Sequence, residues 1–228
     1  MPRGDPSLPY EFNHNLAREA MYKELREEMQ GRKPHAGVIY DIERERQAGD
    51  VATPPDRLAD LAKDENPRVR LLVACNASTP AGALAVLSKD PDEHVRSSVA
   101  FGESTPPDVL ASMAGDPDWM IREIVAHNPS APKTAISVLA DDENESVRVT
   151  VAGRKDLDPS TIEHLTKDKA EEVRMHAIGN PNATVDLLVR IAIFITDDGM
   201  PTDKTREAAM AALQKRVWMD GIASLRSE

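Results

Sequence analysis

The sequence has few aromatic residues and a single cysteine, and these shortages limit the classes of protein to which it can belong. Aromatic residues make up 4% of the 228 residues although 40% are hydrophobic, which excludes a large core built around aromatic rings. Cys75 alone cannot form a disulfide within the chain or ligate a cysteine-bound zinc or iron–sulfur site. No apolar run approaches the roughly 18 residues of a membrane span, and the N-terminus lacks the apolar core of a signal peptide. We therefore expect a soluble, cytoplasmic protein without a cofactor.

Motifs that mark catalysis or nucleic-acid binding are also absent. The six histidines show no HExxH or other paired ligand spacing, and there is no GxSxG turn or glycine-rich phosphate loop. The formal net charge is −11, and residues 51–192 hold 15 basic against 23 acidic residues, whereas phosphate binding needs a basic surface. We expect no catalytic residues, no metal site and no direct binding of nucleic acid.

What the sequence does contain is an internal repeat. A Val-Arg or Ile-Arg pair recurs every 26 residues, and an aspartate stands six residues before each arginine. The positions are Asp64 and Arg70, Asp90 and Arg96, Asp116 and Arg122, Asp142 and Arg148, and Asp168 and Arg174. A fixed period of this size is typical of one supersecondary unit stacked on copies of itself, each burying its apolar face against its neighbours.

Hydrophobic residues at helical spacing predict two short helices in each unit, one on either side of the aspartate. Thr-Pro pairs before the first helix predict an N-cap threonine followed by proline at the first helical position; the threonines are Thr53, Thr79 and Thr105. An asparagine after the second helix suits the left-handed residue that closes a helix, at Asn76, Asn128 and Asn180. Strand signals are absent.

The pattern TPxxxLxxLxxDxxxxVRxxVAxN resembles the leucine-rich repeat variant repeat and, more loosely, the HEAT repeat, over about residues 53–192. The resemblance implies an all-α fold, a right-handed α-solenoid of about five and a half 26-residue, two-helix units in which one helix can be 3₁₀. It also implies that the aspartate and the arginine six residues on form a ladder between neighbouring repeats. We interpret this ladder as structural, and a row of five arginines that binds anions is the alternative.

Three regions divide the chain: residues 1–50 as an N-terminal helical cap, residues 51–192 as the repeat array, and residues 193–228 as a loop plus a C-terminal capping helix. An apolar face over residues 16–29 predicts a helix in the first region, as a cap or as a partner-binding arm. A second apolar face over residues 205–225 predicts the C-terminal capping helix.

Departures from the repeat mark positions at which the units differ. Trp119 and Met120 stand where other units have polar residues or proline. Because these residue types are enriched at interface centres, the pair is a candidate partner contact, with packing against the neighbouring turn as the alternative. The last position of the second helix varies in size, which indicates a groove-lining or edge position; its occupants are Cys75, Phe101, His127, Gly153 and Gly179. The fourth unit has Arg154 in place of asparagine, which predicts altered helix closure and pitch there.

Acidic residues collect in the turns between paired helices, where stacking would place them along one edge. Those we single out as partner contacts are Glu93, Glu143, Glu145, Glu171 and Glu172. Such an edge can attract a basic protein surface, whereas the alternative is that these residues only cap helices and aid solubility. The sequence thus predicts a non-enzymatic scaffold or adaptor that binds another protein. An acidic DNA mimic that blocks a nucleic-acid-binding protein is the second hypothesis and a HEAT-like DNA glycosylase the third. Whether the chain forms a homo-oligomer is left open.

Overall fold

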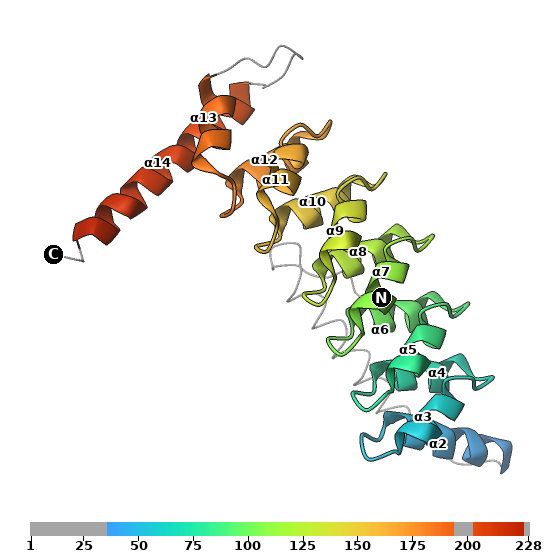
Figure 1. The fold of residues 1–228 in the computed structure, drawn as a ribbon. Coiled ribbons are helices and arrows are strands. Elements are labelled where there is room, and N and C mark those ends of the chain that lie inside the picture. Colours follow the sequence, from blue (N-terminus) through green and yellow to red (C-terminus); the bar gives the residue numbers. More distant parts are fainter. Residues whose placement is uncertain (1–35, 194–202, 226–228) are drawn as a thin grey trace.

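The computed structural model describes residues 36–193 and 203–225, with side chains described for residues 42–193 and 204–216, and every regular element in these parts is a helix (Figure 1). The helix predicted over residues 16–29 and the loop predicted around residues 196–202 lie outside the described residues. The all-α solenoid predicted from the sequence is confirmed.

The helices alternate between two lengths. Short helices of seven residues are α3 (Pro55–Leu61), α5 (Ala81–Leu87), α7 (Pro107–Met113), α9 (Lys133–Leu139) and α11 (Pro159–Leu165). Each is followed by a partner of nine residues, and these partners are α4 (Pro67–Cys75), α6 (Glu93–Phe101), α8 (Trp119–His127), α10 (Glu145–Gly153) and α12 (Glu171–Gly179). Within each set, successive helices begin 26 residues apart. Both members of each pair are α-helices, so neither is the 3₁₀ helix that the resemblance allowed.

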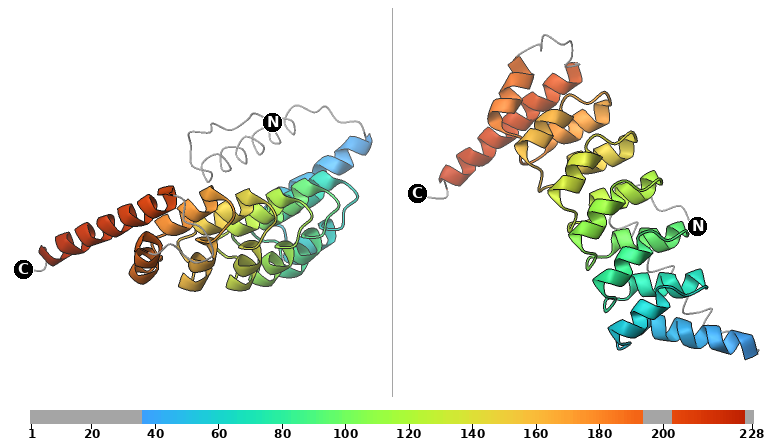
Figure 2. Two further views of the ribbon diagram at one scale, coloured as in Figure 1. Left: turned by 90° about the horizontal axis from the view of Figure 1, so that it is seen from above. Right: turned by 45° about the vertical axis from the view of Figure 1, so that its right-hand side comes forward.

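The pairs follow one another along an elongated array, as Figures 1 and 2 show from three directions. The nine-residue helices pack on one another in sequence order, beginning with α2 (Ala36–Gly49) against α4. At the other end, α14 (Asp203–Leu225) packs against α12 and against α13 (Val185–Ile193). The two ends of the stack are therefore covered by helices that are not part of a regular pair.

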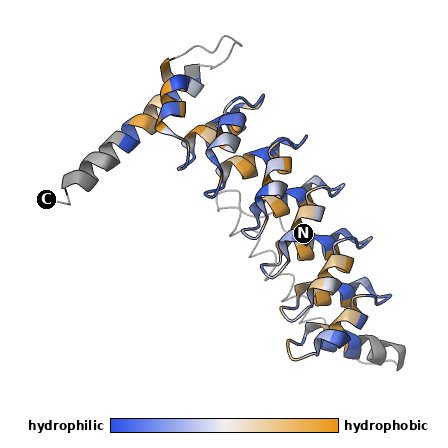
Figure 3. Cartoon of the chain, in the orientation of Figure 1, coloured by the Kyte–Doolittle hydropathy of each residue, from blue (hydrophilic) through white to orange (hydrophobic). Residues whose placement is uncertain are grey.

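A thin continuous core runs through the array, because the same register positions are apolar in every unit. Figure 3 shows hydrophobic colour on the facing sides of the helices and hydrophilic colour in the turns. Fully buried members from successive units are Leu58, Val69, Leu87, Val95, Leu110, Ile121, Leu139, Val147, Ile162 and Val173. Burying a side chain of this size stabilises the fold by roughly 1.5–3 kcal/mol, so the core does not need aromatic rings.

The threonines of the Thr-Pro pairs do not cap the helix that follows them, so this prediction was wrong. The short helices have Pro54, Pro80 and Pro106 at the N-cap position, with no side-chain cap. The Oγ1 atom of Thr79 instead donates a hydrogen bond of 2.6 Å back to the carbonyl of Val73, inside the preceding helix. Thr53 and Thr105 donate in the same way. Each threonine thus stabilises the end of one helix rather than the start of the next.

The asparagines after the nine-residue helices do not adopt the left-handed conformation either. Asn128, for example, has φ −67° and ψ 125°, which is extended backbone. Its Nδ2 atom donates to the carbonyls of Ala100 and Gly102 in the preceding unit, at 2.8 and 3.1 Å. The role of the asparagine is therefore to tie neighbouring units together, and Asn76 and Asn180 make the same pair of bonds.

Arg154 takes over this role in the fourth unit. Its Nη1 atom donates to the carbonyls of Ala126 and Asn128, at 2.6 and 2.9 Å. The same link is made by a longer side chain, so helix closure is retained where the sequence predicted that it would change. Gly102 occupies the equivalent position in the second unit and has no side chain with which to make the link.

Candidate interaction surface

Arginines and aspartates of the repeat form a ladder along one edge of the array. Arg122 donates from Nε to Oδ2 of Asp142 at 2.6 Å and from Nη2 to Oδ1 of the same carboxylate at 2.9 Å. Asp142 lies in the following unit, twenty residues ahead. The same two-pronged contact joins Arg70 to Asp90, Arg96 to Asp116 and Arg148 to Asp168.

The aspartate six residues before each arginine contributes its backbone rather than its carboxylate. Nη1 of Arg122 donates to the carbonyl of Asp116 at 2.8 Å, within the same unit. The carboxylate of Asp116 instead accepts from the amide of Asp118, which is the N-cap of α8. Each of the four arginines Arg70, Arg96, Arg122 and Arg148 therefore links two units, which agrees with the ladder between neighbouring repeats that the resemblance implies, although the carboxylate comes from the following unit.

Burial and charge act against each other on these aspartates. Burial raises the pKa of Asp142, but hydrogen bonds from the Arg122 guanidinium and the Asn144 amide outweigh it and hold the pKa below its usual value of 3.8. The pKa of Asp168 is lowered for the same reasons, with the Arg148 guanidinium and the Ala170 amide as hydrogen-bond donors. Four arginines of the row are thus engaged by carboxylates of the chain itself, which opposes the alternative of an anion-binding row.

The ladder has two different ends. At the first, Arg44 of α2 lies 3.4 Å from Oδ2 of Asp64, so the N-terminal helix supplies the arginine that an earlier repeat would have carried. At the other end, Arg174 donates from Nη1 to the carbonyls of Asp168 and Lys169, but its buried Nε has no hydrogen-bond partner among the described residues. Position 194, twenty residues ahead, is phenylalanine.

Glutamates and one apolar pair occupy the start of the nine-residue helices. Glu93, Trp119, Glu145 and Glu171 hold the first helical position in successive units, so they recur in a row along the array. Trp119 is 39% exposed and Met120, beside it, is 49% exposed. Both side chains therefore keep a substantial part of their surface open to solvent.

The remaining glutamates of the predicted edge are also at the surface. Glu143 is 89% exposed at its side chain and lies 3.5 Å from Nη2 of Arg122, as a second, outer carboxylate on that guanidinium. Glu171 accepts from Lys204 of α14 at 3.0 Å, and Glu172 follows it, exposed, at the second helical position. We call the row of Glu93, Trp119, Met120, Glu143, Glu145, Glu171 and Glu172 the acidic edge.

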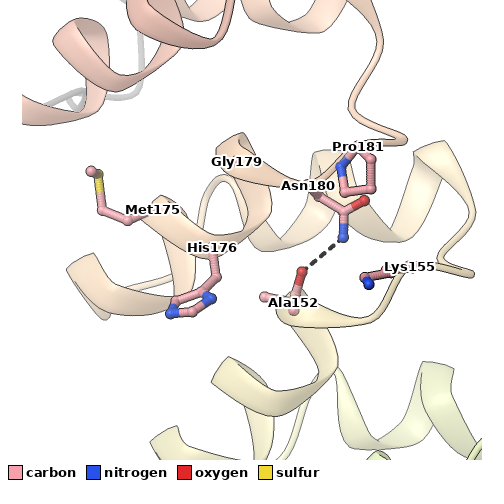
Figure 4. A pocket seen from close by; sticks show the side chains of 8 residues that line it. Ala152, Lys155, Met175, His176, Gly179, Asn180 and Pro181 are labelled. Atoms are coloured by element: carbon pink, nitrogen blue, oxygen red, sulfur yellow. Dashed lines mark hydrogen bonds between the residues drawn. The ribbon is translucent and has the colours of Figure 1, made fainter. Parts of the chain in front are cut away.

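The variable position at the end of the nine-residue helices lines a different part of the surface. Phe101 and His127 are half-buried there, whereas Gly153 and Gly179 leave space. A cavity of about 310 Å³ lies at these glycines, between α10 and α12 (Figure 4). The groove-lining or edge position predicted from the sequence agrees with this cavity, which opens where a side chain is lost at the same position in two successive units.

Two features are absent from the described part of the chain, a metal-binding cluster and a membrane-spanning helix. No cluster of three or more His, Cys, Asp or Glu residues there is arranged to hold a metal ion. None of the described helices combines the length and apolar character needed to cross a membrane.

The fold and its ladder define a solenoid of helical repeats, and comparison with known proteins agrees. The chain is similar to the solved structure of a leucine-rich repeat variant with a novel repetitive structural motif, at 26% identity and a TM-score of 0.57. The match covers 76% of this chain and 66% of that structure, so the chain spans about two thirds of its length. The predicted resemblance to helical repeat proteins of this kind is confirmed.

A second similarity is more distant. Computationally designed armadillo repeat proteins for modular peptide recognition match at 15% identity and a TM-score of 0.30, over 79% of this chain and 94% of the designed one. No family model matches the chain. No curated protein matches it either.

Proposed function

We propose that the chain is a non-enzymatic scaffold that binds a protein partner through the acidic edge, with Trp119 and Met120 as the apolar anchor. The single observation that carries this proposal is the exposure of both side chains at the start of α8. Tryptophan and methionine are enriched at the centres of interfaces, where burying them excludes water from the surrounding polar contacts.

Helix electrostatics support a role for Trp119 beyond the fold. A carboxylate in the first turn of a helix is stabilised by the positive end of the helix dipole, and Glu93, Glu145 and Glu171 gain this contribution. Trp119 lacks this contribution at the same position, and 39% of its surface remains exposed. The exposed part of this ring, at a position where a carboxylate would be favoured, supports a contact with another molecule.

The chemistry of the edge specifies the partner. Glu93 and Glu145 hold the same helix position one unit before and one unit after Trp119, so the apolar anchor lies between carboxylates. The complementary surface is basic and presents an apolar patch between its cations. Opposite charge would speed the encounter, and the apolar contact would slow dissociation.

Affinity capture with matched baits tests the proposal. The wild-type chain, Trp119→Ala and Val138→Ala serve as baits, since Val138 is 61% exposed on α9 and controls for the loss of any surface apolar residue. A protein retained by wild type and Val138→Ala but lost by Trp119→Ala supports the scaffold. Equal recovery by all three baits contradicts it.

A charge-blocking regulator of a nucleic-acid-binding protein is the second candidate, favoured by the exposure of the glutamates on the acidic edge. This candidate predicts a captured protein that itself binds DNA, that is released by high salt, and that the chain displaces from DNA in competition. Salt-resistant binding that depends on Trp119 favours the scaffold instead.

A further inference from the structure

The cavity between α10 and α12 exists because two helices end in glycine. Gly153 and Gly179 occupy the last helical position in successive units, and the space beside them has a volume of about 310 Å³ (Figure 4). Its other lining residues are Ala152, Lys155, Met175, His176, Asn180 and Pro181. The volume lies at the lower end of the range for ligand sites, so it suits one large side chain rather than an extended ligand.

The chain itself shows which group this position accepts. The equivalent residue is Phe101 in the second unit and His127 in the third, and both rings are half-buried. Phe101 packs against the core. In the fourth and fifth units the ring is missing, although the backbone of the surrounding helices repeats with the same period. The empty position therefore has the backbone arrangement in which an aromatic ring is held elsewhere in the array.

Packing does not require glycine at either position. A Cβ atom added at Gly179 would have no atom of another group within 4 Å, and one at Gly153 would have only Nδ1 of His176, at 3.8 Å. Glycine destabilises a helix relative to alanine, so its presence in two successive units lowers stability without relieving a clash. Open space is the property that both glycines share.

The cavity carries the positive charge of Lys155, in contrast to the acidic edge. Lys155 and His176 lie on either side of Ala152 (Figure 4). Within the described residues, no carboxylate is within ion-pair distance of Lys155, although the array as a whole is acidic. The amide of Asn180 is already occupied by the carbonyls of Ala152 and Arg154, so the lysine and the histidine are the groups left to meet a ligand.

We propose that this cavity binds an aromatic side chain of a partner protein that has a carboxylate next to it in sequence. The ring occupies the space left by Gly153 and Gly179, beside Met175, and the carboxylate is paired by Lys155. This site does not rest on the acidic edge, which is expected to select a basic surface, so each can fail without the other.

Three capped tripeptides test separately what the aromatic ring and the carboxylate contribute to binding. The probes are acetyl-Glu-Phe-Glu-amide, acetyl-Glu-Ala-Glu-amide and acetyl-Lys-Phe-Lys-amide, added to the full chain labelled at its methionine methyl groups. The Met175 signal is assigned with Met175→Leu and followed by NMR. We expect saturable shifts with acetyl-Glu-Phe-Glu-amide at a Kd on the order of 1 mM, as suits one buried side chain. The Lys155→Glu change weakens this binding about two- to fivefold, the effect of an exposed ion pair.

Filling the cavity provides the control. Gly179→Phe places in the fifth unit the ring that Phe101 provides in the second, and it abolishes the shifts without lowering the melting temperature. Gly179→Ala adds only a methyl group and retains binding. If Gly179→Phe does not fold, Gly153→His fills the space from α10 instead. Equal shifts with the alanine peptide, no shifts at all, or binding that persists in a folded filled variant overturns the proposal.

Discussion

Arg122 holds the carboxylate of Asp142 in the following unit through two hydrogen bonds, while a third reaches the carbonyl of Asp116 in its own unit. One guanidinium therefore spans the boundary between two units. Because the same contact recurs along the array, the stability of the stack depends on charges that lie at the edge of the core rather than on the core alone.

Acidification should weaken this ladder. The folded pKa of Asp142 is lowered, so its carboxylate stabilises the folded state above the unfolded value near 3.8, and this contribution is lost as pH falls through the folded value. We expect urea unfolding to show a declining free energy below pH 4 or so. Asp142→Asn should be less stable at neutral pH and should decline less steeply. Identical slopes for the two proteins would contradict this role.

An interior arginine of the ladder and the arginine at its C-terminal end should respond differently to substitution. Arg148→Met leaves the buried carboxylate of Asp168 without its partner and should lower the free energy of unfolding by about 3 kcal/mol. Arg174→Met removes hydrogen bonds to two carbonyls but leaves no carboxylate of the described residues unpaired, so about 1 kcal/mol is expected. Chemical denaturation measures both, and equal losses would show that pairing with Asp168 does not matter.

The second unit lacks the two side-chain hydrogen bonds that tie other units to the preceding one, and a substitution can restore them. Gly102→Asn should supply the two bonds that Asn128 makes one unit later, and it should raise stability by about 1 kcal/mol. The new Cβ would lie 2.8 Å from Oγ1 of Thr105, but Asn76 and Thr79 coexist in the same arrangement. Gly102→Ala adds the Cβ without the amide and is the control. A stability of Gly102→Asn no higher than that of Gly102→Ala would exclude the link.

The 26-residue period of the sequence predicts the helices of this structure well, but it does not predict which residues contact one another across units. Apolar spacing identified both helices of every unit because burial depends on register alone. The partner of Arg122 could not be chosen, because with a period of 26 an aspartate lies both six residues before it and twenty after it. Thr79 and Asn128 were misassigned for a related reason. Their side chains bond to carbonyls in the preceding helix or unit, and local capping rules do not consider such partners.

Of the two candidate sites, the sequence predicted one and not the binding role of the other. Trp119 was found because it departs from the repeat toward a larger apolar residue, and its exposure in the structure agrees with a surface position. The position of Gly153 and Gly179 was predicted to line a groove or edge, but no binding role was predicted for it, because an absent side chain carries no chemistry of its own. Only the three-dimensional arrangement brings Lys155 and His176 to the same space.

Glu123 provides a further prediction with the opposite pH dependence. Burial raises the pKa of this carboxyl, and a hydrogen bond of 3.2 Å from Thr150 only partly offsets it. A raised folded pKa means that ionisation disfavours folding, so Glu123→Gln should raise the melting temperature at neutral pH. The gain should vanish below the usual value of 4.5, where both states are protonated. A gain that is independent of pH would contradict the assignment.

The central proposal is that Trp119 becomes buried when a partner binds, and fluorescence quenching tests it most directly. Trp218→Phe leaves Trp119 as the single tryptophan of the chain, which has two. Acrylamide quenching is then measured with and without a saturating partner obtained by capture, with the partner's own emission subtracted. We expect accessible quenching in the free chain, because Trp119 is 39% exposed, and strong protection in the complex. Unchanged quenching of Trp119 in the saturated complex would contradict the proposal.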